Sequence, residues 1–151
     1  MVSELRELYQ DIVLDHNSRP RNFKSLPDAD RVVDGYNPLC GDKIKLFVKL
    51  DGNRIVDIGF QGSGCAISRA SASLMTQEVK GKSKAAAEAL FGKFHHMVTH
   101  GRNGHHDSDD LGELEVMAGV AEFPSRVKCA TLAWHTLHAA LEGKAQAVST
   151  E

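Results

Sequence analysis

The chain has 151 residues, of which 42% are hydrophobic and 25% charged, and its formal net charge is −2. These values are typical of a globular protein with an ordinary core, and residues 1–151 are interpreted as one domain. The charge provides no basic patch for nucleic acid, and no apolar run reaches the roughly 20 residues that span a membrane. The N-terminus lacks the apolar stretch of a signal peptide, so a cytoplasmic location is expected.

The first part of the chain predicts one helix followed by antiparallel strands. Apolar residues recur at helical spacing over residues 3–17. A short strand is expected at residues 32–33, and apolar residues then alternate with lysines over residues 43–50. A hairpin turn at Asp51-Gly52 leads into another strand at residues 55–61. This pattern favours an antiparallel sheet of about three strands.

The second part of the chain predicts helices. Small residues over 66–79 form a helix that ends at Gly81, and Ser83 is a suitable N-cap for a helix that continues toward residue 100. A short amphipathic segment is expected at residues 111–117 and a last helix at 126–142, with 144–151 as a frayed tail. The fold class is therefore α+β.

An odd count of three cysteines argues against a disulfide framework, and each cysteine lies at the edge of a predicted element. Cys40 stands in a tight loop two residues before Asp42, Cys65 follows Gly-Ser-Gly at a helix start, and Cys129 lies in the first turn of the last helix. Pairing of the strands predicted at residues 43–50 and 55–61 brings the loops of Cys40 and Cys65 to one edge of the sheet. Three thiols and one carboxylate are a credible zinc set, although buried filler is the simpler role of a free cysteine. Spacing alone leaves both interpretations open.

Local chemistry supports two features of this set. Gly41 allows the Cys40 and Asp42 side chains to point to one side if it adopts a turn conformation that other residues avoid. The helix start at Cys65 places its thiol at the positive end of a helix dipole, where a thiolate is favoured.

The histidines offer a rival metal site. Five of the eight fall in one segment: His95, His96, His100, His105 and His106. Met97 stands where a metalloprotease motif requires glutamate, so a polar loop exposed to solvent is the simpler interpretation. His135 and His138 on the last helix are interpreted as packing or surface residues. The sequence contains no phosphate-binding glycine loop of the standard types, and no histidine lies next to a cysteine as a hydrolase base.

Three motifs together resemble the U-type iron–sulfur cluster assembly proteins (the IscU/SufU/NifU N-terminal-like family). They are GYNPLCGD at residues 35–42, GSGCAIS at 62–68 and FPSRVKCA at 123–130. The resemblance implies an IscU/SufU-like α+β sandwich, in which an antiparallel three-stranded sheet is covered on one side by helices.

Two departures make the chain look like the SufU branch of that family. Lys128 precedes the third cysteine, where scaffold members carry histidine, and the stretch between the Cys65 helix and Cys129 is long. The SufU resemblance implies a zinc-dependent sulfurtransferase. It would accept persulfide sulfur from a pyridoxal-phosphate cysteine desulfurase (SufS-like) and pass it to the downstream iron–sulfur assembly machinery.

Carried onto this sequence, the resemblance makes Cys40, Asp42, Cys65 and Cys129 the zinc ligands. Cys40 would also be the sulfur acceptor, leaving the metal when a partner histidine takes its place, and Arg126 would stabilise the thiolate-rich site. A scaffold that assembles a [2Fe–2S] cluster, or holds iron, on the same ligands is the alternative. Structural zinc in a binding module is a third interpretation, and it predicts a closed site with unreactive thiols.

Overall fold

The computed structural model describes residues 2–100, 111–143 and 148–149, with side chains described from residue 10 onward. Helices and strands follow one another in this order: α1 (Val2–Ser18), β1 (Arg31–Asn37), β2 (Asp42–Asp51), β3 (Arg54–Ser63), α2 (Ala66–Val79), α3 (Lys84–His100), the 3₁₀ helix η3 (Gly112–Glu122), α4 (Pro124–Leu141) and β4 (Val148–Ser149). Within these ranges, no helix has the length and apolarity needed to cross a membrane.

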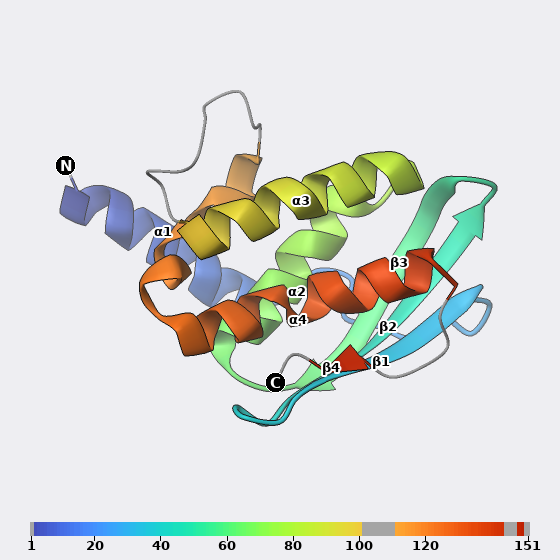
Figure 1. The fold of residues 1–151 in the computed structure, drawn as a ribbon, viewed down its shortest axis with the longest axis horizontal. Coiled ribbons are helices and arrows are strands. Elements are labelled where there is room, and N and C mark those ends of the chain that lie inside the picture. Colours follow the sequence, from blue (N-terminus) through green and yellow to red (C-terminus); the bar gives the residue numbers. More distant parts are fainter. Residues whose placement is uncertain (1, 101–110, 144–147, 150–151) are drawn as a thin grey trace.

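The sheet has four strands in the order β3-β2-β1-β4 (Figure 1). The predicted antiparallel arrangement of β1, β2 and β3 is confirmed. The fourth strand is an addition to the prediction, because Val148–Ser149, in the segment expected to fray, pairs in parallel with Gly35 and Tyr36 of β1. A two-residue strand has no periodicity of its own, so only its contact with β1 reveals it.

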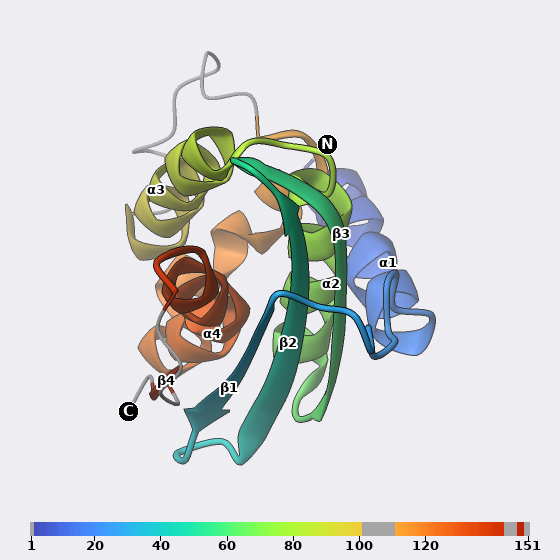
Figure 2. The ribbon, with the colours of Figure 1, turned by 90° about the vertical axis from the view of Figure 1, so that its right-hand side faces the viewer.

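One face of the sheet is covered by helices, as predicted. The α4 helix packs on β1 and β2, and α2 packs on β3 (Figure 2). The alternation expected along β2 is confirmed, since Ile44, Leu46 and Val48 are buried while Lys43 and Lys45 are exposed. Burial of every second side chain on one face is what fixes the register of such a strand.

The helix boundaries follow from local capping. The Ser83 hydroxyl accepts a hydrogen bond of 3.1 Å from the Ala86 amide, which confirms the predicted cap of α3. Gly81, with φ +87°, follows the end of α2 as expected. The prediction that the last helix begins at Arg126 is corrected, because α4 already begins at Pro124. Proline ends the preceding segment and is also well suited to the first helical position.

Candidate metal centre

The Cys40 loop is a tight turn between β1 and β2. The Cys40 amide donates to the Asn37 carbonyl at 3.2 Å, and Gly41 has φ +73°, the left-handed conformation expected for it. The turn leaves the Cys40 thiol exposed, whereas the Asp42 side chain at the start of β2 is only 1% exposed. One end of the turn is therefore open to solvent and the other is buried.

Cys65 is the N-cap residue of α2, as the sequence predicted. Its sulfur accepts from the Ser68 amide at 3.4 Å, and its own amide donates to Asp42 Oδ1 at 2.9 Å. The Cys65 Sγ atom lies 3.9 Å from Asp42 Oδ2. Pairing of Lys43 with Ser63 brings the two loops to the same edge of the sheet, which confirms the hairpin argument.

The close approach of these two loops depends on Gly64. A Cβ atom at this position would collide with the Asp42 carboxylate, and the φ of Gly64 is +155°. Only glycine fits here without displacing Asp42, because any other residue would add an atom where the carboxylate stands. The glycine before Cys65 thus has a packing role at the centre itself.

Cys129 reaches the same point from the first half of α4. Its fully buried Sγ lies 3.3 Å from the exposed Cys40 Sγ. Three donor atoms lie within 4.8 Å of one another, one each from Cys40, Asp42 and Cys129, so this group could hold a metal ion. Cys65 contacts Asp42 at the edge of the group. The structure therefore brings all four predicted residues to one end of the sheet.

Asn37 was missed as a site residue. Its fully buried side-chain amide donates to Asp42 Oδ2 at 3.4 Å and to Cys129 Sγ at 3.5 Å. It lies within the GYNPLCGD motif, but its role does not follow from that pattern, because it depends on the last residue of β1 contacting Cys129 of α4. We expect Asn37 to orient the carboxylate and the buried sulfur.

The electrostatics of the centre suit a cation. Burial, followed by hydrogen bonding to Asp42 and to the other thiols, raises the pKa of the Cys129 thiol far above its usual range. The negative charges of Cys65 and Cys129 in their thiolate forms raise the pKa of Arg126, which lies exposed beside them. A divalent metal ion would displace thiol protons and neutralise the buried carboxylate, and three sulfurs with one carboxylate are donors that zinc accepts.

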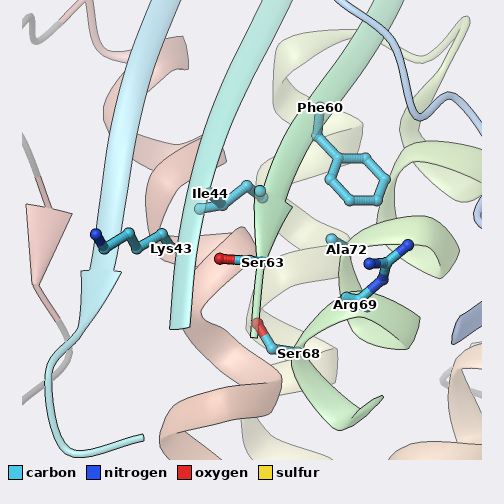
Figure 3. A pocket seen from close by; sticks show the side chains of 8 residues that line it. Lys43, Ile44, Phe60, Ser63, Ser68, Arg69 and Ala72 are labelled. Atoms are coloured by element: carbon cyan, nitrogen blue, oxygen red, sulfur yellow. The ribbon is translucent and has the colours of Figure 1, made fainter. Parts of the chain in front are cut away.

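A small hollow lies next to the centre, between the ends of β2 and β3 and the start of α2 (Figure 3). Ser63 and Ser68 line it on one side, while Lys43 and Arg69 point in different directions. It has room for little more than a water molecule. The hollow therefore has no room for a substrate, and Cys40 is the most exposed of the three thiols.

The rival histidine set is only partly described. His95, His96 and His100 lie exposed on α3, whereas His105 and His106 fall outside the described residues. Ser108, which the sequence suggests as the N-cap of the amphipathic segment at residues 111–117, also lies outside them. Between residues 111 and 122, the expected amphipathic segment is the η3 helix, with Leu114 and Met117 fully buried.

Comparison with known proteins identifies the family. The sequence matches the family described as "NifU-like N terminal domain" over residues 8–142. It is 47% identical to the "Zinc-dependent sulfurtransferase SufU" of Bacillus subtilis, covering 89% of this chain and 90% of that protein. It is also 47% identical to the "Iron-sulfur cluster assembly scaffold protein IscU" of Streptococcus pyogenes, covering 97% of this chain and 90% of that protein.

A solved structure is similar as well. A crystal structure described as a putative iron–sulfur cluster assembly scaffold protein for the SUF system, from Fervidobacterium islandicum, superimposes with a TM-score of 0.80 at 34% identity. It covers 87% of this chain and 94% of that one. The chain therefore belongs to the U-type iron–sulfur cluster assembly proteins with a NifU-like N-terminal domain. Equal identity to relatives named SufU and IscU leaves the two branches unseparated.

Proposed function

We propose that this family member is a SufU-type, zinc-dependent sulfurtransferase that accepts persulfide sulfur from a pyridoxal-phosphate cysteine desulfurase. The observation that carries the proposal is the unequal exposure of neighbouring thiols. Cys40 is exposed while Cys129, 3.3 Å away, is buried. A structural zinc site would be closed, whereas an exposed thiol beside buried donors suits exchange with a partner. Lys128, in place of the histidine of scaffold members, points the same way.

The sulfur-accepting step assigns a covalent role to Cys40. Its thiolate attacks the terminal sulfur of the persulfide on the partner's cysteine. A new S–S bond forms to Cys40, the S–S bond of the donor breaks, and the partner's cysteine leaves as a thiolate. The transfer exchanges one persulfide for another, so no oxidant or reductant is consumed.

The remaining residues keep the acceptor ready for this step. Asp42, Cys65 and Cys129 are the proposed companion metal ligands, and bound zinc would keep the thiols deprotonated at neutral pH. Asn37 donates to both Asp42 and Cys129 and so holds them in place. Arg126, whose charge interacts with Cys65 and Cys129, offsets the negative charge that several thiolates accumulate.

The recipient of the sulfur is proposed to be the downstream iron–sulfur assembly machinery, with transfer in the cytoplasm. The exposed Cys40 loop is the part of the centre that both the donor and the recipient would have to reach. A carrier of this kind needs one accessible sulfur and does not need a closed substrate pocket.

A scaffold that assembles a [2Fe–2S] cluster is the second candidate. The specific observation in its favour is the equal identity to a relative named as an IscU scaffold. Three cysteines with Asp42 are also a donor set that could hold iron. In that case the cluster is the cargo of the protein, and the same four residues would bind it.

The first experiment is the metal content and visible absorbance of protein purified without oxygen. About one zinc per chain in a colourless solution is expected for the sulfurtransferase. A brown protein with stoichiometric iron and sulfide would instead support the scaffold.

The second experiment places the transferred sulfur. The protein is incubated with a cysteine desulfurase and free cysteine, and its peptides are then mapped by mass spectrometry without a reductant. One added sulfur atom on the peptide of Cys40 is expected, with the peptides of Cys65 and Cys129 as internal controls. Absence of sulfur on all three, in protein that holds its zinc, would contradict the proposal.

A further inference from the structure

The short strand β4 lies along the edge of β1 that faces away from β2, close to the cysteine centre (Figures 1 and 2). It pairs in parallel with Gly35 and Tyr36 of β1. The next residue is Asn37, the last of β1, whose side-chain amide contacts two of the proposed metal ligands. The part of β1 that β4 covers therefore leads directly into the centre.

Two described points of the chain show how β4 is aligned with β1. Gly143, with φ +78°, follows the end of α4, and a Cβ atom there would lie 3.7 Å from the guanidinium group of Arg31 at the start of β1. Val148 then lies beside Gly35, in the second half of β1. The chain thus advances in the same direction as β1, from its first residue toward the Cys40 turn.

One apolar side chain anchors β4. Val148 is half-buried and packs against the hydrophobic core, whereas Ser149 is exposed. The strand contacts both β1 and α4. A ladder of two residues contributes few hydrogen bonds, so the attachment of β4 depends mainly on the burial of this valine.

The end of β1 is restrained on its other sides as well. A Cβ atom at Gly35 would collide with the Thr136 side chain, so the backbone of β1 packs directly on α4. Across the sheet, Asn37 pairs with Asp42 of β2, and its carbonyl accepts from the Cys40 amide at 3.2 Å. Because β4 covers the remaining edge, the position of Asn37 and of the turn after it depends on β4 too.

We propose that β4 is a strap that holds the end of β1 in place and so controls how readily Cys40 separates from Cys129. While β4 is paired, Asn37 is fixed against Cys129, and the Cys40 sulfur stays beside the buried one. When β4 detaches, the end of β1 becomes an edge with one neighbouring strand, and the turn that follows gains freedom. Val148 is thus a positioning residue for the centre.

Such a strap suits a thiol that must alternate between two positions. The gating role rests on the proposed function, because a sulfur acceptor has to bring Cys40 out to a partner. The holding role does not, since any metal ion bound at this centre would be retained longer while β4 is paired. Detachment costs less free energy than opening the sheet, because β4 has two residues and one half-buried apolar side chain.

The test is Val148→Asp in the full chain, which places a carboxylate in the apolar contact of β4. Three rates are measured without a desulfurase: hydrogen exchange of the amides of residues 31–37, alkylation of Cys129 in metal-free reduced protein, and transfer of zinc from the loaded protein to a chelator. Each rate is expected to rise about fivefold or more. Cys129 is fully buried, so its alkylation reports opening of the centre.

Three further variants separate the strap from other effects. Val148→Ile keeps the apolar contact and should behave as the wild type. Val56→Asp adds the same charge at an exposed position of β3, at the end of that strand remote from the centre, and should leave the three rates unchanged. A chain that ends at Gly143 lacks β4 altogether and should reproduce Val148→Asp. Hydrogen exchange over α2 shows whether the rest of the fold stays intact.

Three outcomes would overturn the proposal. One is unchanged hydrogen exchange at residues 31–37 in both Val148→Asp and the chain that ends at Gly143. Another is faster exchange there with unchanged alkylation of Cys129 and unchanged zinc transfer, because β4 would then stabilise the β1 edge alone. The third is an equal rise of exchange over α2 in the shortened chain, which would show loss of the whole fold. Failure to accept sulfur while the three rates behave as expected would contradict the proposed function and support the holding role.

Discussion

The two halves of α4 take part in two side-chain clusters that are built in different ways. Near its start, Cys129 meets a turn and a helix N-terminus, and backbone geometry holds the set together. Further along, His135 and His138 meet α3 through side chains alone. The cysteine centre is positioned by backbone geometry, whereas the histidines between α3 and α4 are positioned by ring contacts and ion pairs of their side chains. The cysteine centre should therefore depend on its turn residues, and the histidine contacts only on their own imidazole side chains.

The largest effect at the cysteine centre is the loss of sulfur acceptance that we expect in Cys40→Ala. The variant should fold normally, because the thiol is exposed, but it should accept no sulfur from a desulfurase. Mass spectrometry after incubation with the desulfurase measures the effect. If this variant still gains a persulfide, Cys40 is not the acceptor.

Asp42→Ala tests the buried side of the cysteine centre. Loss of a carboxylate that is 1% exposed and lies close to Cys65 and Cys129 should lower zinc affinity by about a hundredfold. Competition with a chelator measures this affinity. The matched control is Asp34→Ala on β1, whose carboxylate is 43% exposed and pairs with Lys45, and it should retain zinc normally. Unchanged affinity in Asp42→Ala would remove Asp42 from the ligand set.

Gly64→Ala tests whether backbone geometry holds the cysteine centre. The added methyl group collides with Asp42 and strains φ, so we expect a loss of about 2 kcal/mol in the free energy of unfolding, with weaker zinc binding. Gly92→Ala on α3 is the control, because no atom lies within 4 Å of its added methyl. It should stabilise the protein by about 0.5–1 kcal/mol in a denaturant titration. A Gly64→Ala variant with unchanged stability and unchanged zinc binding would contradict this role of Gly64.

The smallest effect is expected from His16, which is buried, whereas the histidines of α3 are exposed. It is 1% exposed, and its Nδ1 lies 2.7 Å from the Ser73 hydroxyl, which also accepts from the Arg21 amide. Burial lowers its pKa in the folded state below the usual 6.5. The unfolded chain therefore binds a proton first, so stability should fall as pH drops below about 6.5.

Denaturant titrations between pH 7.5 and pH 5 measure this dependence. The control is His16→Gln, which lacks the imidazole and should lose part of the slope. An identical slope in both proteins would show that the pKa of His16 is the same in the folded and unfolded states.

Much of the fold was predictable because it depends on local patterns. Alternating burial along β2, the cap at Ser83 and the turn at Gly41 are each decided within a few residues. The meeting of Cys40 and Cys65 was predictable for a related reason. They flank one hairpin, and antiparallel pairing of its two strands brings both flanking loops to the same edge of the sheet.

The rest required the folded chain. The pairing of Val148–Ser149 with β1, the contact of Asn37 with Cys129 and the convergence of His95 with His135 all join segments that are distant in sequence. By itself the sequence determined which residues could serve as donors and which elements carry them, since side-chain chemistry and periodicity are local. Only the tertiary structure decided which donors meet, because that depends on how helices and strands pack against one another.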